Sequence, residues 1–278
     1  MSGLPPGRLQ QIAQRLVTVD GIQAVLLGGS RGRGEHTAGS DTDLGLYYRP
    51  PLDLDGLRRI ARDLGCDEAE LTEPGAWGPW VDGGGWLVID GQPVDWIYRD
   101  LDRVQAAWRD AVEGIFTFHA QIGHPLGVPD FSYPGEVALG VVLADPSGEL
   151  TELRGRTSTY PPALSDAICR KCLWEARFLL SIAAKAVHRA DTSYLAGCLF
   201  RVVELCAHAL HGRAGRWLIN EKGAIAAAGR IAFAPSNFAA RAHGLLGDLG
   251  TTPSQLAKQL READDLIHQT SRACAPPR

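Results

Sequence analysis

The sequence predicts an α+β fold, in which a small mixed sheet with its helices comes first and a helical bundle follows. In the first part, short apolar runs typical of strands alternate with segments of helical periodicity. A middle part is rich in glycine and proline, and we expect a connector with little regular structure, broken by a short element at 136–145. In the last part, apolar residues recur every three to four positions, as in helices. The predicted boundaries are 1–115, 116–160 and 161–278.

The N-terminal elements follow from patterning and turn residues. Residues 22–29 are an apolar run that ends in two glycines, which predicts a buried strand. Residues 84–100 predict a hairpin, because Asp90-Gly91 is a favoured turn between two β-like runs. A further strand is predicted at 42–48, and helices are predicted at 9–19, 54–65 and 101–112.

Each C-terminal helix is marked by an apolar face. The last one is predicted to start at Thr252, a natural N-cap, with Pro253 as its first residue. Cys169 and Cys172 form a C-x-x-C motif inside a helical stretch. No second pair of cysteines or histidines completes a tetrahedral zinc site, so we expect buried thiols rather than a metal or redox centre.

Composition limits the classes of function. The chain has 278 residues, 45% hydrophobic and 22% charged, which is the ordinary globular range. Its net charge of −4 gives no hint of a nucleic-acid or anionic-membrane partner. No apolar run reaches the roughly 18 residues that span a bilayer, and the N-terminus lacks the apolar core of a signal peptide. We therefore expect a cytoplasmic protein.

The stretch from Gly28 to Tyr48, GGSRGRGEHTAGSDTDLGLYY, carries most of the candidate chemistry. A Walker P-loop requires a lysine after its glycines, and none follows here. A dinucleotide fingerprint requires a third glycine after Gly32 and Gly34, and that glycine is missing as well. Both common phosphate-binding motifs are therefore excluded.

Two aspartates stand two residues apart at the start of the second strand. Asp41 and Asp43 therefore project to one face, about 7 Å apart along the backbone. Asp95, on the hairpin, offers a third carboxylate on a neighbouring strand. Clustered carboxylates repel one another unless a cation neutralises them, and Mg²⁺ prefers oxygen ligands. We predict a metal site formed by Asp41, Asp43 and Asp95.

Small residues at the end of the first strand suit a phosphate group. Gly29 allows close approach of the backbone, and the Ser30 hydroxyl with the N–H groups of a following turn can hold a terminal phosphate. Arg31 and Arg33 can add charge-assisted hydrogen bonds to the same anion.

Together these residues resemble the signature of the DNA polymerase β-like nucleotidyltransferase superfamily: Gly-Ser, a gap of ten residues, then Asp-x-Asp. The local form is most similar to the minimal and the antibiotic-modifying, kanamycin-type nucleotidyltransferases. The motif resemblance covers roughly residues 20–100, whereas the helical part is similar only in layout. The matching positions are Gly29, Ser30, Arg33, Gly34, Glu35, Ser40, Asp41, Asp43 and Leu44, with Asp95 in the place of the third carboxylate.

The resemblance implies an enzyme that transfers a nucleoside monophosphate from ATP or another nucleoside triphosphate to a hydroxyl group, with two Mg²⁺ ions. It implies that Asp41, Asp43 and Asp95 are catalytic and hold one ion, and that Asp41 and Asp43 also hold the second. It further implies that Gly29, Ser30 and Arg33 bind the nucleotide. In relatives a lysine of the helical domain reaches the phosphates, a part that Lys222 would play here.

Weaker candidates surround this set. Glu136 and Glu175 are candidate general bases, although a structural or surface role is the alternative for each. A cluster of tryptophans near the expected cleft suits either ring stacking or core packing: Trp77, Trp80, Trp86 and Trp96. A polar helix face suits either an acceptor site or solvent: Arg201, Glu204, His208 and His211.

Three kinds of function remain open. A small hydroxylated acceptor, of which an aminoglycoside-like antibiotic is one example, is favoured by the two domains in one chain. An alternative is an adenylyltransferase that acts on a protein or on tRNA, as in toxin–antitoxin pairs, although the acidic chain disfavours nucleic acid. The third is a non-catalytic nucleotide-binding protein, which is disfavoured because all three carboxylates are present.

Overall fold

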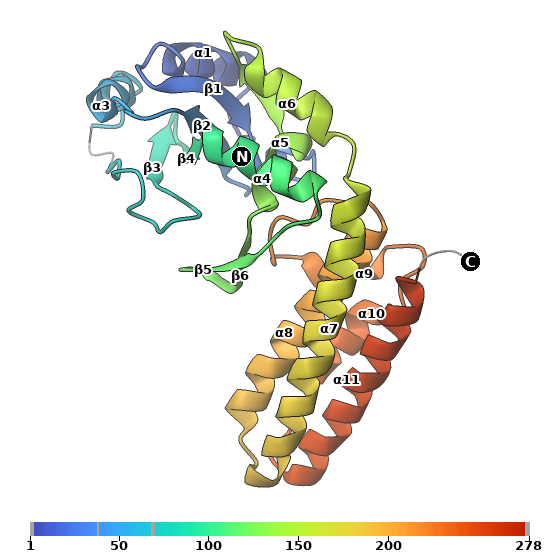
Figure 1. Cartoon of the computed structure of the whole chain (residues 1–278). Helices are drawn as coiled ribbons and strands as arrows, with labels where there is room; N and C mark the ends of the chain where they lie inside the picture. The colour runs from blue at the N-terminus through green and yellow to red at the C-terminus, as the bar shows by residue number, and fades with distance from the viewer. Residues whose placement is uncertain (1–2, 38, 68–69, 276–278) are drawn as a thin grey trace. The chain divides into compact units, whose positions relative to one another are not determined.

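The computed structural model describes residues 3–37, 39–67 and 70–275. The chain divides into two compact units, labelled by element in Figure 1. The first unit comprises Met1–Asp110 and Phe116–Thr159, and the second comprises Ala111–Ile115 and Tyr160–Arg278.

The first unit is built on a five-stranded mixed sheet, as the sequence predicts. Its strand order is β3-β4-β2-β1-β7, in which β2 and β4 are parallel and the other neighbours are antiparallel. The strands of this sheet are β1 (Ile22–Leu27), β2 (Thr42–Tyr48), β3 (Gly84–Ile89), β4 (Gln92–Asp100) and β7 (Val141–Ala144). The turn between β3 and β4 has positive φ at Asp90 and Gly91, as a tight hairpin turn requires.

One face of the sheet is covered by two helices, α1 (Pro6–Leu16) and α3 (Leu54–Asp63). Leu44 and Leu46 of β2 and Trp96 of β4 are fully buried on this face. The apolar stripes of the two helices complete this core, since alternate residues of a strand share one face. The predicted division of β2 into an apolar face and an aspartate face is therefore confirmed.

The opposite face is covered only in part. Three helices pack over one end of it: α4 (Leu101–Val112), α5 (Ser132–Leu139) and α6 (Glu149–Thr157). Tyr47 of β2 is fully buried beneath them, whereas Asp43, four residues earlier on the same face, is only half-buried. The aspartates thus lie at the uncovered end of this face.

The expectation of an irregular connector at 116–160 is wrong. The segment contains α5, β7, α6 and a small hairpin of β5 (Phe118–Gln121) and β6 (His124–Pro129), and β7 joins the main sheet beside β1. Some of its glycines and prolines lie at the ends of elements, and others lie inside β6, α5 and α6. Pro134 lies in the first turn of α5, and Gly148, with φ of +78°, precedes α6.

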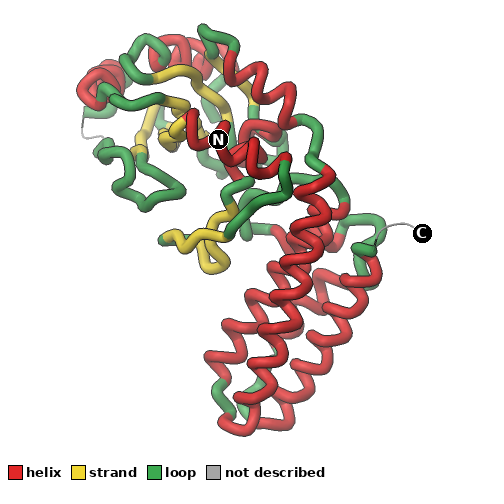
Figure 2. Tube along the Cα trace, in the orientation of Figure 1, coloured by secondary structure: helices red, strands yellow, loops and turns green. Residues whose placement is uncertain are grey.

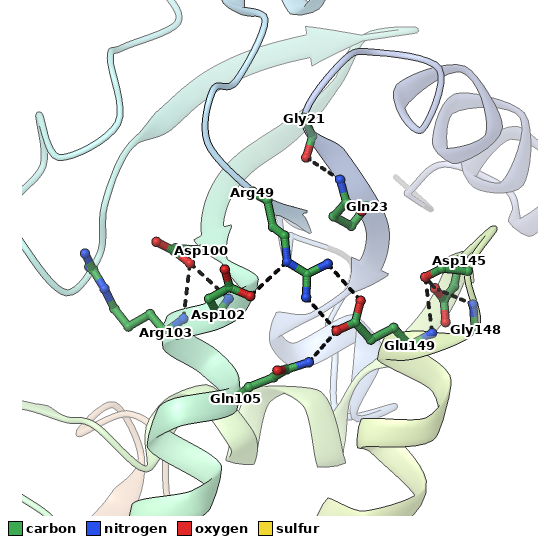
Figure 3. A network of polar contacts seen from close by, with 11 residues as sticks. Gly21, Gln23, Arg49, Asp100, Asp102, Arg103, Gln105, Asp145, Gly148 and Glu149 are labelled. Carbon is green, nitrogen blue, oxygen red and sulfur yellow. Dashed lines mark hydrogen bonds and ion pairs between the residues drawn. The ribbon is translucent and has the colours of Figure 1, made fainter.

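An arginine network ties this covered end together (Figure 3). Arg49, directly after β2, donates two hydrogen bonds to Glu149 of α6, at 2.6 and 2.9 Å, and one to Asp102 of α4 at 2.8 Å. Gln105 of α4 donates a further hydrogen bond to Glu149. These charge-assisted hydrogen bonds link α4 and α6 to the end of β2.

The second unit is helical, as predicted, and Figure 2 shows its long helices in red. It contains α7 (Pro162–Ala186), the short 3-10 helix η1 (Val187–Arg189), α8 (Thr192–Arg213), α9 (Ala224–Gly229), α10 (Phe238–Gly247) and α11 (Pro253–Ala273). Thr252 caps α11 in a capping box with Gln255, which confirms the predicted start of that helix.

Helix α8 forms the core of this unit. It is long and apolar enough to cross a membrane by composition alone, but 67% of its apolar window is buried inside the protein. It packs against α7 and α11, as expected of a core helix. Cys169 and Cys172 are buried in α7 as free thiols, and burial raises the pKa of Cys172 well above its usual value.

Candidate active site

Asp43 and Asp95 lie side by side at the uncovered end of the sheet. They are direct partners in the parallel register of β2 and β4, so their side chains project to the same face. Both are half-buried, and Asp41, just before β2, is exposed. The structure therefore brings two of the three predicted carboxylates together, Asp43 and Asp95. The third, Asp41, lies two residues before Asp43 in the sequence.

The two carboxylates are poorly stabilised as anions. The pKa of Asp95 is raised to about 6, first by burial and then by the charges of Asp43 and Asp41. Burial, followed by the charges of Glu136 and Asp41, also raises the pKa of Asp43. A cation at this position would relieve both repulsions.

The donor set of Asp43 and Asp95 fits a divalent cation, because Mg²⁺ is bound by one or two carboxylates together with water and substrate phosphates. Within residues 3–37, 39–67 and 70–275, however, no three His, Cys, Asp or Glu side chains are grouped closely enough to hold a metal ion. The role of Asp41 as a third ligand thus stays a prediction.

The glycine-serine turn packs against Asp43. The Gly28 N–H donates to the Asp43 carbonyl at 2.9 Å, and the chain then enters the single helical turn α2 (Gly29–Gly32). Gly29 has φ of +56°, and a Cβ at this position would lie 1.7 Å from Asp43 Oδ2. Only glycine fits there, and Ser30 follows it, half-buried, on the turn.

The two arginines of the loop differ in their roles. Arg31 donates to the carbonyls of Ser40 and Asp41 at 2.7 to 3.2 Å, so it holds the chain just before β2 rather than standing ready for an anion. Arg33 is exposed and pairs with Glu35 at 3.0 Å. Its charge lowers the pKa of Asp43, opposing the burial that raises it. The role of Arg33 in binding a phosphate stays a prediction.

A buried ion pair beneath Asp43 was not foreseen from the sequence. Arg99 of β4 donates to Glu136 of α5 at 2.7 Å, and each side chain is only 12% exposed. Glu136 Oε1 also approaches Gly28 and Gly45, so this carboxylate lies on the glycine-turn side of Asp43. The alternation 95, 97, 99 along β4 is the signal that places Arg99 on the aspartate face.

The helical unit contains the other candidates. Lys222 is exposed in the turn before α9, and its backbone N–H donates to Asn220 Oδ1 at 2.8 Å. Glu175 is half-buried and accepts a hydrogen bond from Arg201 at 2.5 Å, so its carboxylate is paired with a cation. Their roles in catalysis stay predictions.

The polar face of α8 is buried rather than solvated. Glu204, His208 and His211 are 3 to 6% exposed. Burial, and then the charge of Glu221, raises the pKa of Glu204 to about 7. Burial, and then the neighbouring His211, lowers the pKa of His208 to about 3.

The four tryptophans separate into two groups. Trp96 is fully buried in the core. Trp80 is half-buried, packs against the edge of a core cluster and stacks on His119 with ring centroids 3.8 Å apart. Trp86 is 68% exposed and stacks on Trp77 with centroids 4.5 Å apart. The second pair lies at the surface of the sheet's aspartate face.

Comparison with known proteins agrees with this arrangement. Residues 9–73 match the family model of the nucleotidyltransferase domain, which includes the glycine turn, Asp41 and Asp43. No curated protein sequence matches the chain. Among solved structures, a nucleotidyltransferase-like protein from Exiguobacterium sibiricum 255-15 aligns at a TM-score of 0.49 and 11% identity, over 95% of this chain and 74% of that one.

A TM-score below 0.5 does not establish a shared fold, so the assignment rests on the family match. That match covers the strand, the glycine turn and the first two carboxylates, which are the elements that the structure brings together. The N-terminal part of this chain is a nucleotidyltransferase domain of the DNA polymerase β-like kind, and the protein is a transferase that moves a nucleoside monophosphate.

Proposed function

We propose that this protein transfers a nucleoside monophosphate, AMP in the first instance, from a Mg²⁺-bound triphosphate to a hydroxyl of a small molecule and releases pyrophosphate. The observation that carries the proposal is the pairing of Asp43 with Asp95 beside the Gly29 turn. This arrangement joins a carboxylate pair suited to a cation with a turn suited to phosphate.

The glycine turn is proposed to bind the β- and γ-phosphates. The first N–H groups of a helical turn have no partner within the turn, so they can donate to phosphate oxygens. The Ser30 hydroxyl adds a neutral donor, and Arg33 adds charge from the exposed loop. In this arrangement Arg31 positions the loop, because its Nε and Nη2 donate to the carbonyls of Ser40 and Asp41.

Asp43 and Asp95, with Asp41, are proposed to hold two Mg²⁺ ions. When bound, these ions would neutralise the charge on the phosphates and lower the pKa of the acceptor hydroxyl. Asp95 lies on the side of Asp43 away from the glycine turn, so its carboxylate is the one nearest the incoming acceptor. The Arg99–Glu136 pair lies near Asp43, where the charge of Glu136 raises the pKa of Asp43 and the charge of Arg99 lowers it.

The acceptor is proposed to be a hydroxylated small molecule, and aminoglycoside-like antibiotics are among the first to test. The acidic net charge disfavours tRNA as the acceptor. We further propose that the reaction takes place in the cytoplasm. The proposed part of Lys222 is to bind the phosphates from the helical unit.

The experiment is a transfer assay with labelled ATP, GTP, CTP and UTP against a panel of acceptors, followed by mass spectrometry. The panel contains aminoglycosides, simple glycosides, a tRNA pool and a mixed protein sample. The proposal expects an adduct of one nucleoside monophosphate on a small molecule, with equimolar pyrophosphate. Labelled protein or tRNA alone would favour the second class of acceptor, and binding without any transfer would favour a non-catalytic protein.

A further inference from the structure

Asp43, Asp95 and Trp86 form one row across three neighbouring strands. Asp95 of β4 is the register partner of Asp43 on one side and of Trp86, on β3, on the other. Register partners on adjacent strands project to the same face, with Cβ atoms about 5 Å apart. The Trp86 indole therefore lies directly beside the Asp95 carboxylate.

The Trp86 ring is exposed although it is large and apolar. It is 68% exposed, and its inner side stacks on Trp77 with ring centroids 4.5 Å apart and an interplanar angle of 23°. Gly84 makes room for this stack, because a Cβ there would lie 3.1 Å from the Trp77 ring and 1.9 Å from the Trp96 carbonyl. The result is an indole platform at the edge of the sheet.

The loop that carries Trp77 is held in place by buried groups. Asp82 is 4% exposed and accepts from the Tyr48 hydroxyl at 2.9 Å and from the Gly75 N–H at 2.8 Å. Gln121 of β5 donates to the Trp77 carbonyl and accepts from the Val81 N–H at 3.3 Å. The stack is therefore organised before any ligand arrives, which lowers the entropy cost of binding.

The position of the indole platform indicates which of the two substrates, the triphosphate or the acceptor, it would contact. The glycine turn follows β1, on one side of Asp43, whereas Trp86 lies beyond Asp95 on the other side. In phosphoryl transfer the attacking and leaving oxygens are roughly in line across the phosphorus atom. With pyrophosphate at the glycine turn, the acceptor must approach from the side of β3.

We propose that Trp86, backed by Trp77, is the acceptor subsite, and that the reacting hydroxyl is carried by a sugar or cyclitol ring whose C–H face stacks on the indole. This inference rests on the proposed function, because it takes the phosphates to lie at the glycine turn. An exposed indole suits such a ring, since one side is apolar while the hydroxyl groups at the rim stay hydrated. Stacking there would bring a ring hydroxyl toward Asp95.

The test is saturation-transfer NMR with ring and non-ring probes. The probes are methyl α-D-glucopyranoside, myo-inositol and 2-deoxystreptamine, with glycerol as the acyclic control, each added with Mg²⁺ and a non-hydrolysable ATP analogue. The proposal expects saturation of the C–H protons on one face of at least one ring probe and none on glycerol. In Trp86→Ala the ring signal should weaken roughly tenfold, as expected for loss of one aromatic stack.

Two further variants distinguish the loss of aromatic stacking from a general disturbance of the structure. Trp86→Phe keeps an aromatic ring and should retain most of the signal. Val88→Ala removes an apolar side chain that is 63% exposed on the same face of the same strand, opposite Pro93 rather than Asp95, and should change nothing. No saturation of any ring probe in the wild type, or an undiminished signal in folded Trp86→Ala, would overturn the proposal.

Calorimetry of the Mg-ATP analogue on the same samples separates this inference from the proposed function. Equal nucleotide affinity in the wild type and Trp86→Ala is expected, because the phosphates bind on the other side of the aspartates. Nucleotide binding without binding of any ring probe would contradict the acceptor subsite but leave the proposed function standing. Absence of nucleotide binding would contradict the proposed function as well.

Discussion

Gly29 and Asp43 are packed so closely that a Cβ on Gly29 would lie 1.7 Å from Asp43 Oδ2. The same glycine has φ of +56°, a conformation that costs an L residue roughly 1–2 kcal/mol. The glycine turn and the aspartate strand are thus one unit, and a side chain at residue 29 would disturb both proposed binding functions together.

The first prediction concerns this contact. Gly29→Ala should displace the Asp43 carboxylate and weaken Mg-ATP binding by roughly tenfold or more, since a misplaced ligand loses much of its interaction. Gly34→Ala is the matched control: Gly34 has φ of +70° in the same loop, but nothing lies within 4 Å of its added Cβ. The control variant should lose thermal stability but keep its affinity for Mg-ATP. Calorimetry with thermal melts compares them, and equal nucleotide affinity in the two variants would contradict the account.

Ser30→Ala should weaken binding of ATP more than binding of AMP. The hydroxyl is proposed to meet the β- and γ-phosphates, which AMP lacks. The loss for ATP should be about 1–3 kcal/mol, as for a hydrogen bond to a charged group. Affinities for ATP, ADP and AMP, measured side by side, check this prediction. An equal loss of affinity for ATP and AMP would show that Ser30 does not contact the β- and γ-phosphates.

Asp95→Asn should lower kcat far more than nucleotide affinity. Asp41 and Asp43 remain to hold the ion that accompanies the triphosphate, whereas the acceptor side loses a ligand and a charge. Loss of one electrostatic stabiliser of the transition state predicts roughly a 10²-fold decrease in kcat. Turnover is followed by pyrophosphate release in the presence of an acceptor. Wild-type turnover in a folded variant would place the third carboxylate elsewhere.

Glu204 predicts a pH dependence of stability in the helical unit. Its pKa is raised from 4.5 to about 7 by burial and by Glu221, so the folded state holds the proton more tightly than the unfolded state. The contribution of Glu204 to the free energy of unfolding should therefore fall as pH rises from about 4.5 to about 7 and level off above that, whereas His208, with its lowered pKa, contributes in the opposite direction. The Glu204 contribution is measured as the difference in unfolding free energy between the wild type and Glu204→Gln, in urea titrations across this range. A pH dependence that persists unchanged in the variant would assign it to other groups.

Local patterns predicted most of the fold correctly. The turn at Asp90-Gly91, the limits of β2 and the cap at Thr252 follow from residues close in sequence, which is where propensity and turn chemistry act. Residues 116–160 depart from the prediction because short elements here include glycine and proline, which composition alone assigns to loops. Strand β7 pairs with β1 across more than a hundred residues, and no local pattern reveals such a partner.

At the candidate site, too, local features were predictable from the sequence, whereas contacts between residues distant in sequence were not. The spacing of Asp41 and Asp43 and the alternation along β4 predicted which face carries the carboxylates, and the structure pairs Asp43 with Asp95 in register. The partner of Arg99 comes from a helix 37 residues away, so the buried pair beneath Asp43 could not be read from the sequence. The use of Arg31 by its own loop depends on backbone carbonyls that adopt their positions only in the folded chain.

The central claim is that the aspartate pair and the glycine turn together bind a metal-bound triphosphate. Calorimetric titration of ATP into the wild-type protein with Mg²⁺, and again with EDTA in excess, tests this most directly, with Asp43→Asn as the matched variant. The account predicts clear binding with Mg²⁺ and loss of most of the affinity both in EDTA and in the variant. Affinity that is unchanged in EDTA would contradict it, because the two carboxylates would then have no cation to hold.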